Sequence, residues 1–178
     1  IRISVNVIGM KNSFKILLAL LLVQACKEKT DISSISPVNW EKRTVQNLPA
    51  DSLLQGTSYL SVYSQIYSQT EHSTHDLTAT VSMRNVNRED TIYIARAEYF
   101  NTEGNLIRTY FDQTIYIAPM ETVEIIIDER DKSGGTGANF LFQWKVKPNT
   151  HQPLFEGVMI STSGQQGLSF TTQGQVLN

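Results

Sequence analysis

The densest group of chemically capable side chains lies in an acidic, glycine-rich stretch late in the chain. Glycine-rich stretches can cradle phosphate, but neither G-x-x-x-x-G-K-[ST] nor G-x-G-x-x-G occurs here. The acids also lack the spacing of an EF-hand calcium loop. A wide strand connection would explain the glycines without any ligand. The stretch is nevertheless our first candidate for a ligand or interaction surface, through Asp128, Asp131, Ser133, Gly134, Gly135, Gly137 and Asn139.

A hydrolase is the enzyme class that this stretch suggests, with Asp128, Glu129, Asp131 and Ser133 as candidate groups. A carboxylate or hydroxyl catalyses a reaction only when a partner positions it and exchanges its proton. No G-x-S-x-G elbow or H-E-x-x-H helix accompanies these residues, and the histidines lie far away in sequence. We therefore expect no catalytic residues and a protein that is not an enzyme, with an envelope hydrolase as an alternative.

A second group that could do chemistry consists of His72, His75 and Asp76, in a segment that we predict to be a polar loop over residues 69–76. Imidazole and carboxylate groups bind metals, but structural zinc requires four ligands. The third histidine, His151, lies in a distant turn. We expect solvated loop histidines and neither a metal nor another cofactor, with a metal-binding protein as a further alternative.

A row of tyrosines is the most suggestive surface feature of the sequence. Residues 59–67 alternate like a strand, so Tyr59, Tyr63 and Tyr67 are predicted to share one face, opposite an apolar face. Tyrosine offers a large amphipathic area, which suits stacking on sugar rings or contact with another protein. Alternatively the row packs under a neighbouring segment, because exposed aromatic stripes are unusual.

The elements that must position these groups are strands. From Leu77 to Asp128, apolar residues occur at every second position and short polar turns separate the runs. About eight such segments follow one another, and one helical turn is predicted at residues 51–56. This pattern predicts an all-β, Ig-like antiparallel β-sandwich of about seven to eight strands, without the paired cysteines of true Ig domains. Single strands are expected over residues 59–67, 106–116, 154–162 and 168–176.

The start of the chain has the layout of an export signal. A basic lead at residues 10–15 precedes an apolar run at residues 16–23, which is too short to span a membrane. The run ends at Ala25 and Cys26, the single cysteine. This arrangement resembles the lipobox of bacterial lipoproteins, in which the cysteine is lipidated. We predict an upstream extension at residues 1–9, a signal peptide at 10–25, the anchor and tether at 26–55, and a sandwich domain at 56–178.

The charge of the chain argues against nucleic acid as a partner. The whole sequence has a formal net charge of −2, and residues 1–25 contain three basic residues and no acid. Removing this segment would therefore leave a net charge of −5. A protein that binds phosphate backbones needs the opposite sign.

Six segments between about Gly56 and Val176 carry a resemblance to a known family. They are residues 63–67, 81–85, 98–100 with Gly104, 118–119, 133–140 and 157–160. In order and spacing they resemble the bacterial domain-of-unknown-function family 3124. The resemblance implies an exported domain that is often lipid-anchored, and it implies no activity and no catalytic residues.

These observations lead to one functional hypothesis and the two alternatives given above. We expect a non-enzymatic binding or interaction module, exported and held at the bacterial cell envelope, in the periplasm or on the surface. Its predicted partners are the membrane, through a lipidated Cys26, and an envelope protein or glycan.

Overall fold

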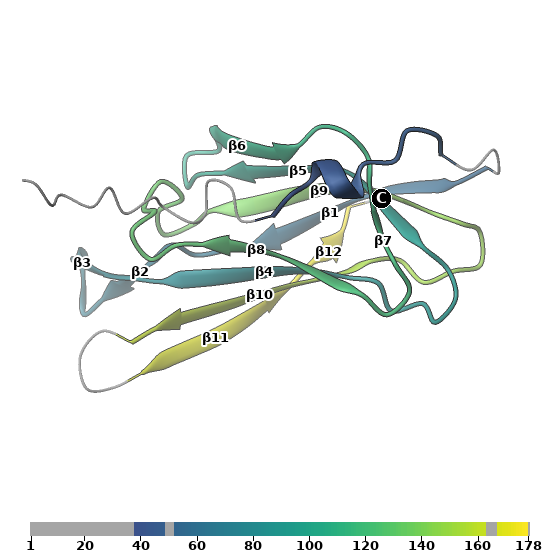
Figure 1. Ribbon diagram of the computed structural model, residues 1–178. Coiled ribbons are helices and arrows are strands. Elements are labelled where there is room, and N and C mark those ends of the chain that lie inside the picture. The colour runs from purple at the N-terminus through teal and green to yellow at the C-terminus, as the bar shows by residue number, and fades with distance from the viewer. Residues whose placement is uncertain (1–37, 49–51, 163–166, 178) are drawn as a thin grey trace, which may run out of the picture. The chain divides into compact units, whose positions relative to one another are not determined.

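The computed structural model describes residues 38–48, 52–162 and 167–177, all within one compact unit, Ile32–Asn178 (Figure 1). In these residues the chain forms strands and one short 3-10 turn, η2 (Glu41–Arg43), and no α-helix. The strands are β1 (Leu54–Ser61), β2 (Gln65–Ser68), β3 (Thr70–Asp76), β4 (Thr78–Arg84), β5 (Ile92–Phe100), β6 (Leu106–Phe111), β7 (Ile115–Ile117), β8 (Thr122–Ile127), β9 (Asn139–Val146), β10 (Leu154–Ser161), β11 (Leu168–Gln173) and β12 (Gln175–Val176).

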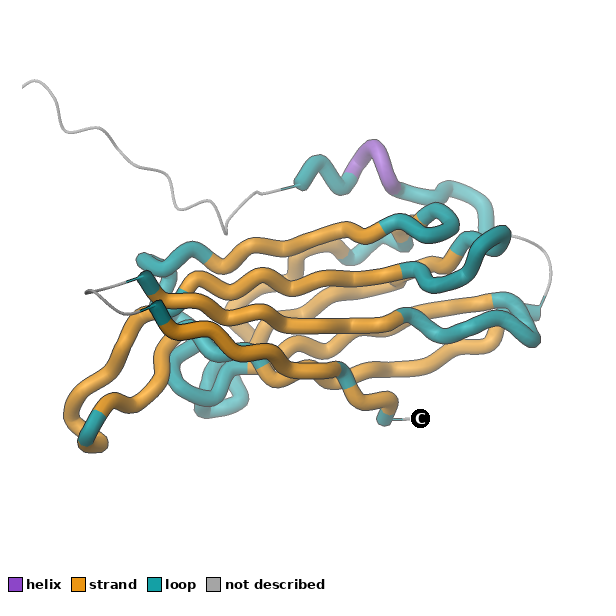
Figure 2. Tube along the Cα trace, turned by 90° about the horizontal axis from the view of Figure 1, so that it is seen from below, coloured by secondary structure: helices purple, strands orange, loops and turns teal. Residues whose placement is uncertain are grey.

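The strands form two antiparallel sheets that face each other. The larger sheet has the order β12-β1-β9-β5-β6, with β7 also paired to β5, and the smaller sheet has the order β11-β10-β4-β8. Strands β2 and β3 form a separate hairpin that extends beyond one end of the sheets (Figure 2). The predicted all-β antiparallel sandwich is confirmed. The described residues contain more strands than expected because several predicted strands are interrupted.

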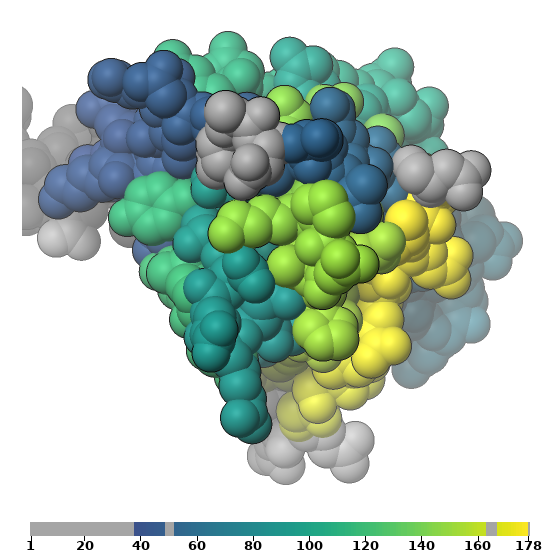
Figure 3. Space-filling model, turned by 90° about the vertical axis from the view of Figure 1, so that its right-hand side faces the viewer, coloured from purple at the N-terminus to yellow at the C-terminus, as the bar shows by residue number. Residues whose placement is uncertain are grey.

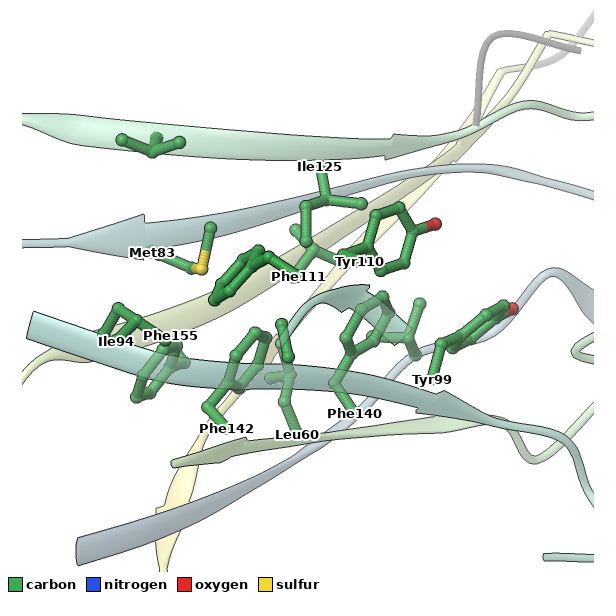
Figure 4. Packing of buried hydrophobic residues seen from close by; sticks show 14 of the residues in the cluster. Leu60, Met83, Ile94, Tyr99, Tyr110, Phe111, Ile125, Phe140, Phe142 and Phe155 are labelled. Carbon is green, nitrogen blue, oxygen red and sulfur yellow. The ribbon is translucent and has the colours of Figure 1, made fainter. Parts of the chain in front are cut away.

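Stacked aromatic rings join the two sheets. Phe142 of β9 and Phe155 of β10 lie with ring centroids 4.2 Å apart and an interplanar angle of 7°, and Phe140 continues the stack at 5.4 Å from Phe142 (Figure 4). All three rings are buried. Each fully buried side chain of this size contributes about 1.5–3 kcal/mol. The alternation predicted for β9 therefore supplies the centre of the core.

The predicted strand over residues 59–67 is divided. Strand β1 ends at Ser61, and the chain bends at residues 62–64 before β2 begins. The bend is bonded to a distant loop, because the N–H of Gln65 donates to the C=O of Gly135 at 3.1 Å. Local alternation cannot reveal such a contact.

Two other local predictions are wrong. Residues 70–76 form β3 rather than a loop, and nearly all of them are exposed. Pairing with β2, and not burial of one face, makes this segment a strand, so the apolar alternation that identifies strands is absent. The helical turn predicted at residues 51–56 is also wrong from Leu54 onward, because β1 begins there and Leu54 pairs with Val146.

The predicted strands over residues 106–116 and 168–176 are each broken into two. The second break has a clear geometric reason, since β11 pairs with β10 of the smaller sheet and β12 pairs with β1 of the larger one. Gly174 lies at this crossing and donates its N–H to the C=O of Phe155 at 2.8 Å. A Cβ atom at Gly174 would lie 2.9 Å from the Cβ of Phe155, so the crossing requires glycine.

Buried asparagines hold one end of the sandwich together. The side-chain amide of Asn85 donates to the carbonyls of Asp90, Ile117 and Ala118 at 2.8–3.0 Å. Asn87 donates to the C=O of His151 at 3.0 Å, and the N–H of His151 donates back to Asn87 Oδ1 at 2.8 Å. Figure 3 shows this end, where residues 147–153 lie beside residues 85–91. The bonds satisfy polar groups that would otherwise be costly to bury.

Part of the predicted tether packs on the domain. The ring of Trp40 lies 4.7 Å from that of Phe111, and Arg43 forms an ion pair of 2.7 Å with Glu121. Cys26 and the predicted signal peptide lie outside the described residues. Among the residues that are described, no helix is long and apolar enough to cross a membrane.

Candidate binding surface

The glycine-rich loop, residues 128–138 between β8 and β9, is bonded to its surroundings. Besides its bond with Gln65, the loop accepts hydrogen bonds at the C=O of Gly134 from the N–H and the Oγ1 of Thr102, both at 3.1 Å. The N–H of Gly137 donates to the same Oγ1 at 2.9 Å. The loop is therefore fixed between the β1–β2 bend and the β5–β6 hairpin.

Backbone conformation or close packing accounts for the three glycines of this loop, with a different reason at each position. Gly135 has a φ of +71°, which favours glycine. A Cβ atom at Gly134 would overlap the hydroxyl of Tyr99 and lie 2.9 Å from Ser64 Oγ. A Cβ atom at Gly137 would lie 3.3 Å from Thr102 Cγ2. Only one of the three is explained by positive φ, and none requires a bound phosphate.

A buried polar network lies beneath the loop. Asp131 is only 5 % exposed, and its carboxylate accepts from Arg108 at 3.1 Å and from the hydroxyl of Ser133. Arg108 also donates to the hydroxyl of Tyr110 at 2.9 Å. Burial works to lower the pKa of Arg108, but its bonds to Tyr110 and Asp131 raise that pKa overall. The guanidinium therefore stays charged and neutralises Asp131, which makes this carboxylate a poor general base.

The Tyr99 hydroxyl is the exception in this network. Its ring is fully buried and stacked on Phe140 at 4.7 Å. The hydroxyl has no hydrogen-bond partner of normal geometry among the described residues, although Ser64 is close. Burial raises the pKa of the Tyr99 phenol. The group therefore stays neutral, since ionisation in the core would be costly.

The structure separates the remaining candidate residues. Tyr59 is half-buried on β1, Tyr63 lies in the bend with its ring edge-on to Phe170 at 5.8 Å, and Tyr67 is 61 % exposed on the hairpin. Asn139 begins β9, and Asp128 is engaged by Arg130 at 2.8 Å. The tyrosines thus form no single row, although the bend beside Tyr63 contacts the glycine-rich loop.

The histidine group lies on the hairpin. His72 is 3.3 Å from Glu71, while Asp76 pairs with Lys132 at 2.6 Å. Within residues 38–48, 52–162 and 167–177, no three His, Cys, Asp or Glu side chains come close enough together to hold a metal ion. The described structure therefore offers no support for the metal-binding alternative.

A shallow depression of about 180 Å³ lies elsewhere, on the outer face of the larger sheet. Its polar lining consists of Gln55 and Thr57 from β1 and of Gln143 and Lys145 from β9. The other lining residues are Gly56, Trp144 and, from β5, Ala95. The side chains of the four polar residues form no hydrogen bond or ion pair with any described residue.

The pairing of β1, β9 and β5 places nine residues, including the four polar lining residues, on this outer face, and we call these nine residues the grid. Paired residues on neighbouring strands point to the same face, as do residues two positions apart. The three outward rows across β1, β9 and β5 are Gln55–Lys145–Tyr93, Thr57–Gln143–Arg96 and Tyr59–Leu141–Glu98.

Sequence reasoning did not identify the depression. Its polar residues alternate with buried ones, which indicates only a wet strand face. The sequence shows the alternation along each strand, but it does not show the strand pairing that places Thr57 beside Gln143.

The fold is an all-β sandwich of two antiparallel sheets, and the outer face of its larger sheet carries polar side chains. The chain belongs to the family described as protein of unknown function (DUF3124), whose model matches residues 55–177. The resemblance seen in the sequence is thereby confirmed. No curated protein matches the chain.

One solved structure resembles the chain, the crystal structure of Thermotoga maritima 1070. The two share 10 % sequence identity with a TM-score of 0.43, over 67 % of this chain and 92 % of that chain.

Proposed function

We propose that this protein is a non-enzymatic binding module of the bacterial cell envelope and that its ligand contacts the outer face of the larger sheet. The observation that carries the proposal is the contrast between two groups of polar residues. In the glycine-rich loop, Asp128 and Asp131 are engaged by arginines. At the depression, the side chains of Gln143 and Lys145 form no hydrogen bond or ion pair with any described residue and remain available to a ligand.

The scaffold suits this role because the grid lies on central strands. Strands β1, β9 and β5 are adjacent in the larger sheet, and β9 is paired along its length on both sides. Sites built on strands are held more precisely than sites on loops. The backbone under the depression is therefore prepared for binding before a ligand arrives, which reduces the entropy lost on association.

We also propose that Cys26 is lipidated and that the membrane is one partner. The support is the basic lead and the apolar run that end at this cysteine. Each acyl CH₂ buried in a membrane contributes about 0.8 kcal/mol, so several chains would hold the protein without a spanning helix.

The binding proposal can be tested with envelope fragments from the native cells. Full-length protein carrying Cys26→Ser, which removes the lipid contribution, should sediment with the fragments. Adding Ala95→Leu should fill the depression and weaken the apparent affinity for the fragments at least about tenfold, which corresponds to a lost contact of about 1.4 kcal/mol or more.

The matched control is Thr80→Leu, which also enlarges a half-buried, outward-facing residue, but on the smaller sheet. It should leave sedimentation unchanged, and circular dichroism should show both variants folded. If the Ala95 and Thr80 variants sediment equally, or the parent does not sediment at all, the proposed binding face is wrong.

A further inference from the structure

We propose that the depression binds an acidic saccharide, with Lys145 pairing with a sugar carboxylate and Gln55, Thr57 and Gln143 bonding to ring hydroxyls. This inference rests on the proposed binding function and specifies the class of ligand. It follows from the shape, the hydrogen-bonding groups and the charge of the grid.

The shape of the depression comes from a β-bulge that carries a small residue. Ile94 pairs with Trp144 and Arg96 pairs with Gln143, so Ala95 has no partner on β9. Bulges re-aim side chains and interrupt pairing. The sheet is therefore hollowed at Ala95, where a longer side chain would close the depression.

The polar lining matches the hydroxyl groups of a sugar. Gln55 and Gln143 each carry two N–H donors and a carbonyl acceptor, and the hydroxyl of Thr57 both donates and accepts. Sugar hydroxyls likewise donate and accept. Because these side chains have no partners in the described structure, a ligand need not break protein bonds to engage them. The lining is too polar for a purely apolar ligand.

The charge of the grid selects an acidic sugar over a neutral one. The ammonium of Lys145 is unpaired within the described residues, whereas Arg96 is 3.3 Å from Glu98. The grid therefore carries one uncompensated positive charge on a chain whose formal net charge is −2. A polyphosphate needs several cations, and the grid offers only one. A saccharide with widely spaced carboxylates needs only one cation at a time.

An aromatic ring completes the grid. Tyr59 lies on the same outward face, two residues beyond Thr57, and is half-buried. A partly exposed ring provides a flat apolar surface with a polar tip, which suits the C–H face of a sugar. The grid spans about 10 Å across three strands and about 14 Å along them. It can therefore hold a short saccharide rather than a single small ion.

Isothermal titration of the full-length protein with a trimer of galacturonic acid and with its neutral methyl ester tests the inference. The acid should bind about tenfold more tightly than the ester, because a hydrogen bond to a charged group contributes about 1.5–3 kcal/mol. Lys145→Gln should remove this preference, so that the acid and the ester bind equally, while Lys42→Gln, the same charge change on exposed η2, should preserve the tenfold preference. Ala95→Leu should abolish binding of both trimers.

Each other outcome overturns a stated claim. Equal binding of acid and ester, an unaltered acid affinity in Lys145→Gln, or no binding of either trimer would show that the ligand is not an acidic saccharide. If sedimentation with envelope fragments still depends on Ala95 in those cases, the proposed binding function stands. Loss of that sedimentation after protease treatment of the fragments would identify a protein partner instead.

Discussion

The substitution Gly134→Ala tests whether the glycine-rich loop is built for packing or for a ligand. Gly134 has no positive φ, so alanine introduces no backbone strain and should stabilise the protein by about 0.4–1 kcal/mol through the unfolded chain. The overlap of the new Cβ with the Tyr99 hydroxyl opposes this gain, because it destabilises the folded state. The sign of the net effect shows which of the two dominates.

We expect the overlap to dominate. Overpacking a core costs about 1–3 kcal/mol, and the upper part of that range applies when the neighbour cannot move. The ring of Tyr99 is fully buried and stacked on Phe140, and the new Cβ would also lie 2.8 Å from the Cβ of Ala138. The variant should therefore lose about 2 kcal/mol, which for a chain of this size lowers Tm by about 4–8 °C.

Urea unfolding of the single and double variants with Tyr99→Phe measures the effect. Tyr99→Phe removes a buried hydroxyl that lacks a normal partner in the described structure, so it should be neutral or stabilising by about 1 kcal/mol. In the double variant the worst overlap disappears, and we expect a favourable coupling of at least about 1 kcal/mol. Gly104→Ala, where a Cβ atom meets open space at a φ of +80°, is the control and should show no coupling.

Two results would contradict a collision between the new Cβ and the Tyr99 hydroxyl. If Gly134→Ala unfolds at the same urea concentration as the parent, the loop adapts without cost. If the effects of Gly134→Ala and Tyr99→Phe add to within about 0.5 kcal/mol, the two groups do not collide.

Three further outcomes are expected. Asp131→Ala should lower the free energy of unfolding by about 3 kcal/mol in urea titrations, because it leaves the partly buried Arg108 without its carboxylate; a loss under about 1 kcal/mol would contradict this account. The hydrogen bond from Arg43 lowers the pKa of Glu121. The ionised Glu121 carboxylate should therefore stabilise the protein fully at neutral pH, and this stabilisation should disappear as the pH falls from about 5 towards 3. Glu121→Gln should therefore flatten the stability profile across that window, and an unchanged acid dependence would exclude the pair as its cause. Cys26→Ser should move the protein from the detergent phase to the aqueous phase when a detergent extract of the cells is phase-separated, and mass spectrometry that finds an unmodified Cys26 in the mature native protein would disprove the anchor.

The sequence alone was sufficient to predict which segments are extended and which side of most of them is buried. The alternation from Leu77 to Ile127 and from Phe140 to Val146 reappears as buried residues on β4, β5, β8 and β9. This success has a local cause, because successive side chains on a strand point to opposite faces whatever the strand pairs with. Strand β3 lacks a buried face and therefore gave no such signal.

Tertiary contacts decided what the candidate residues do. The spacing of Asp131, Gly134 and Tyr99 gives no indication that a partly buried arginine neutralises Asp131, or that Gly134 lies against the hydroxyl of Tyr99. In the same way, Gln143 and Lys145 are unremarkable polar residues until the register sets them beside Gln55 and a bulge hollows the sheet. Alternation along one strand is a local property of the backbone, whereas register and contact depend on segments far apart in the chain, so only the folded structure reveals them.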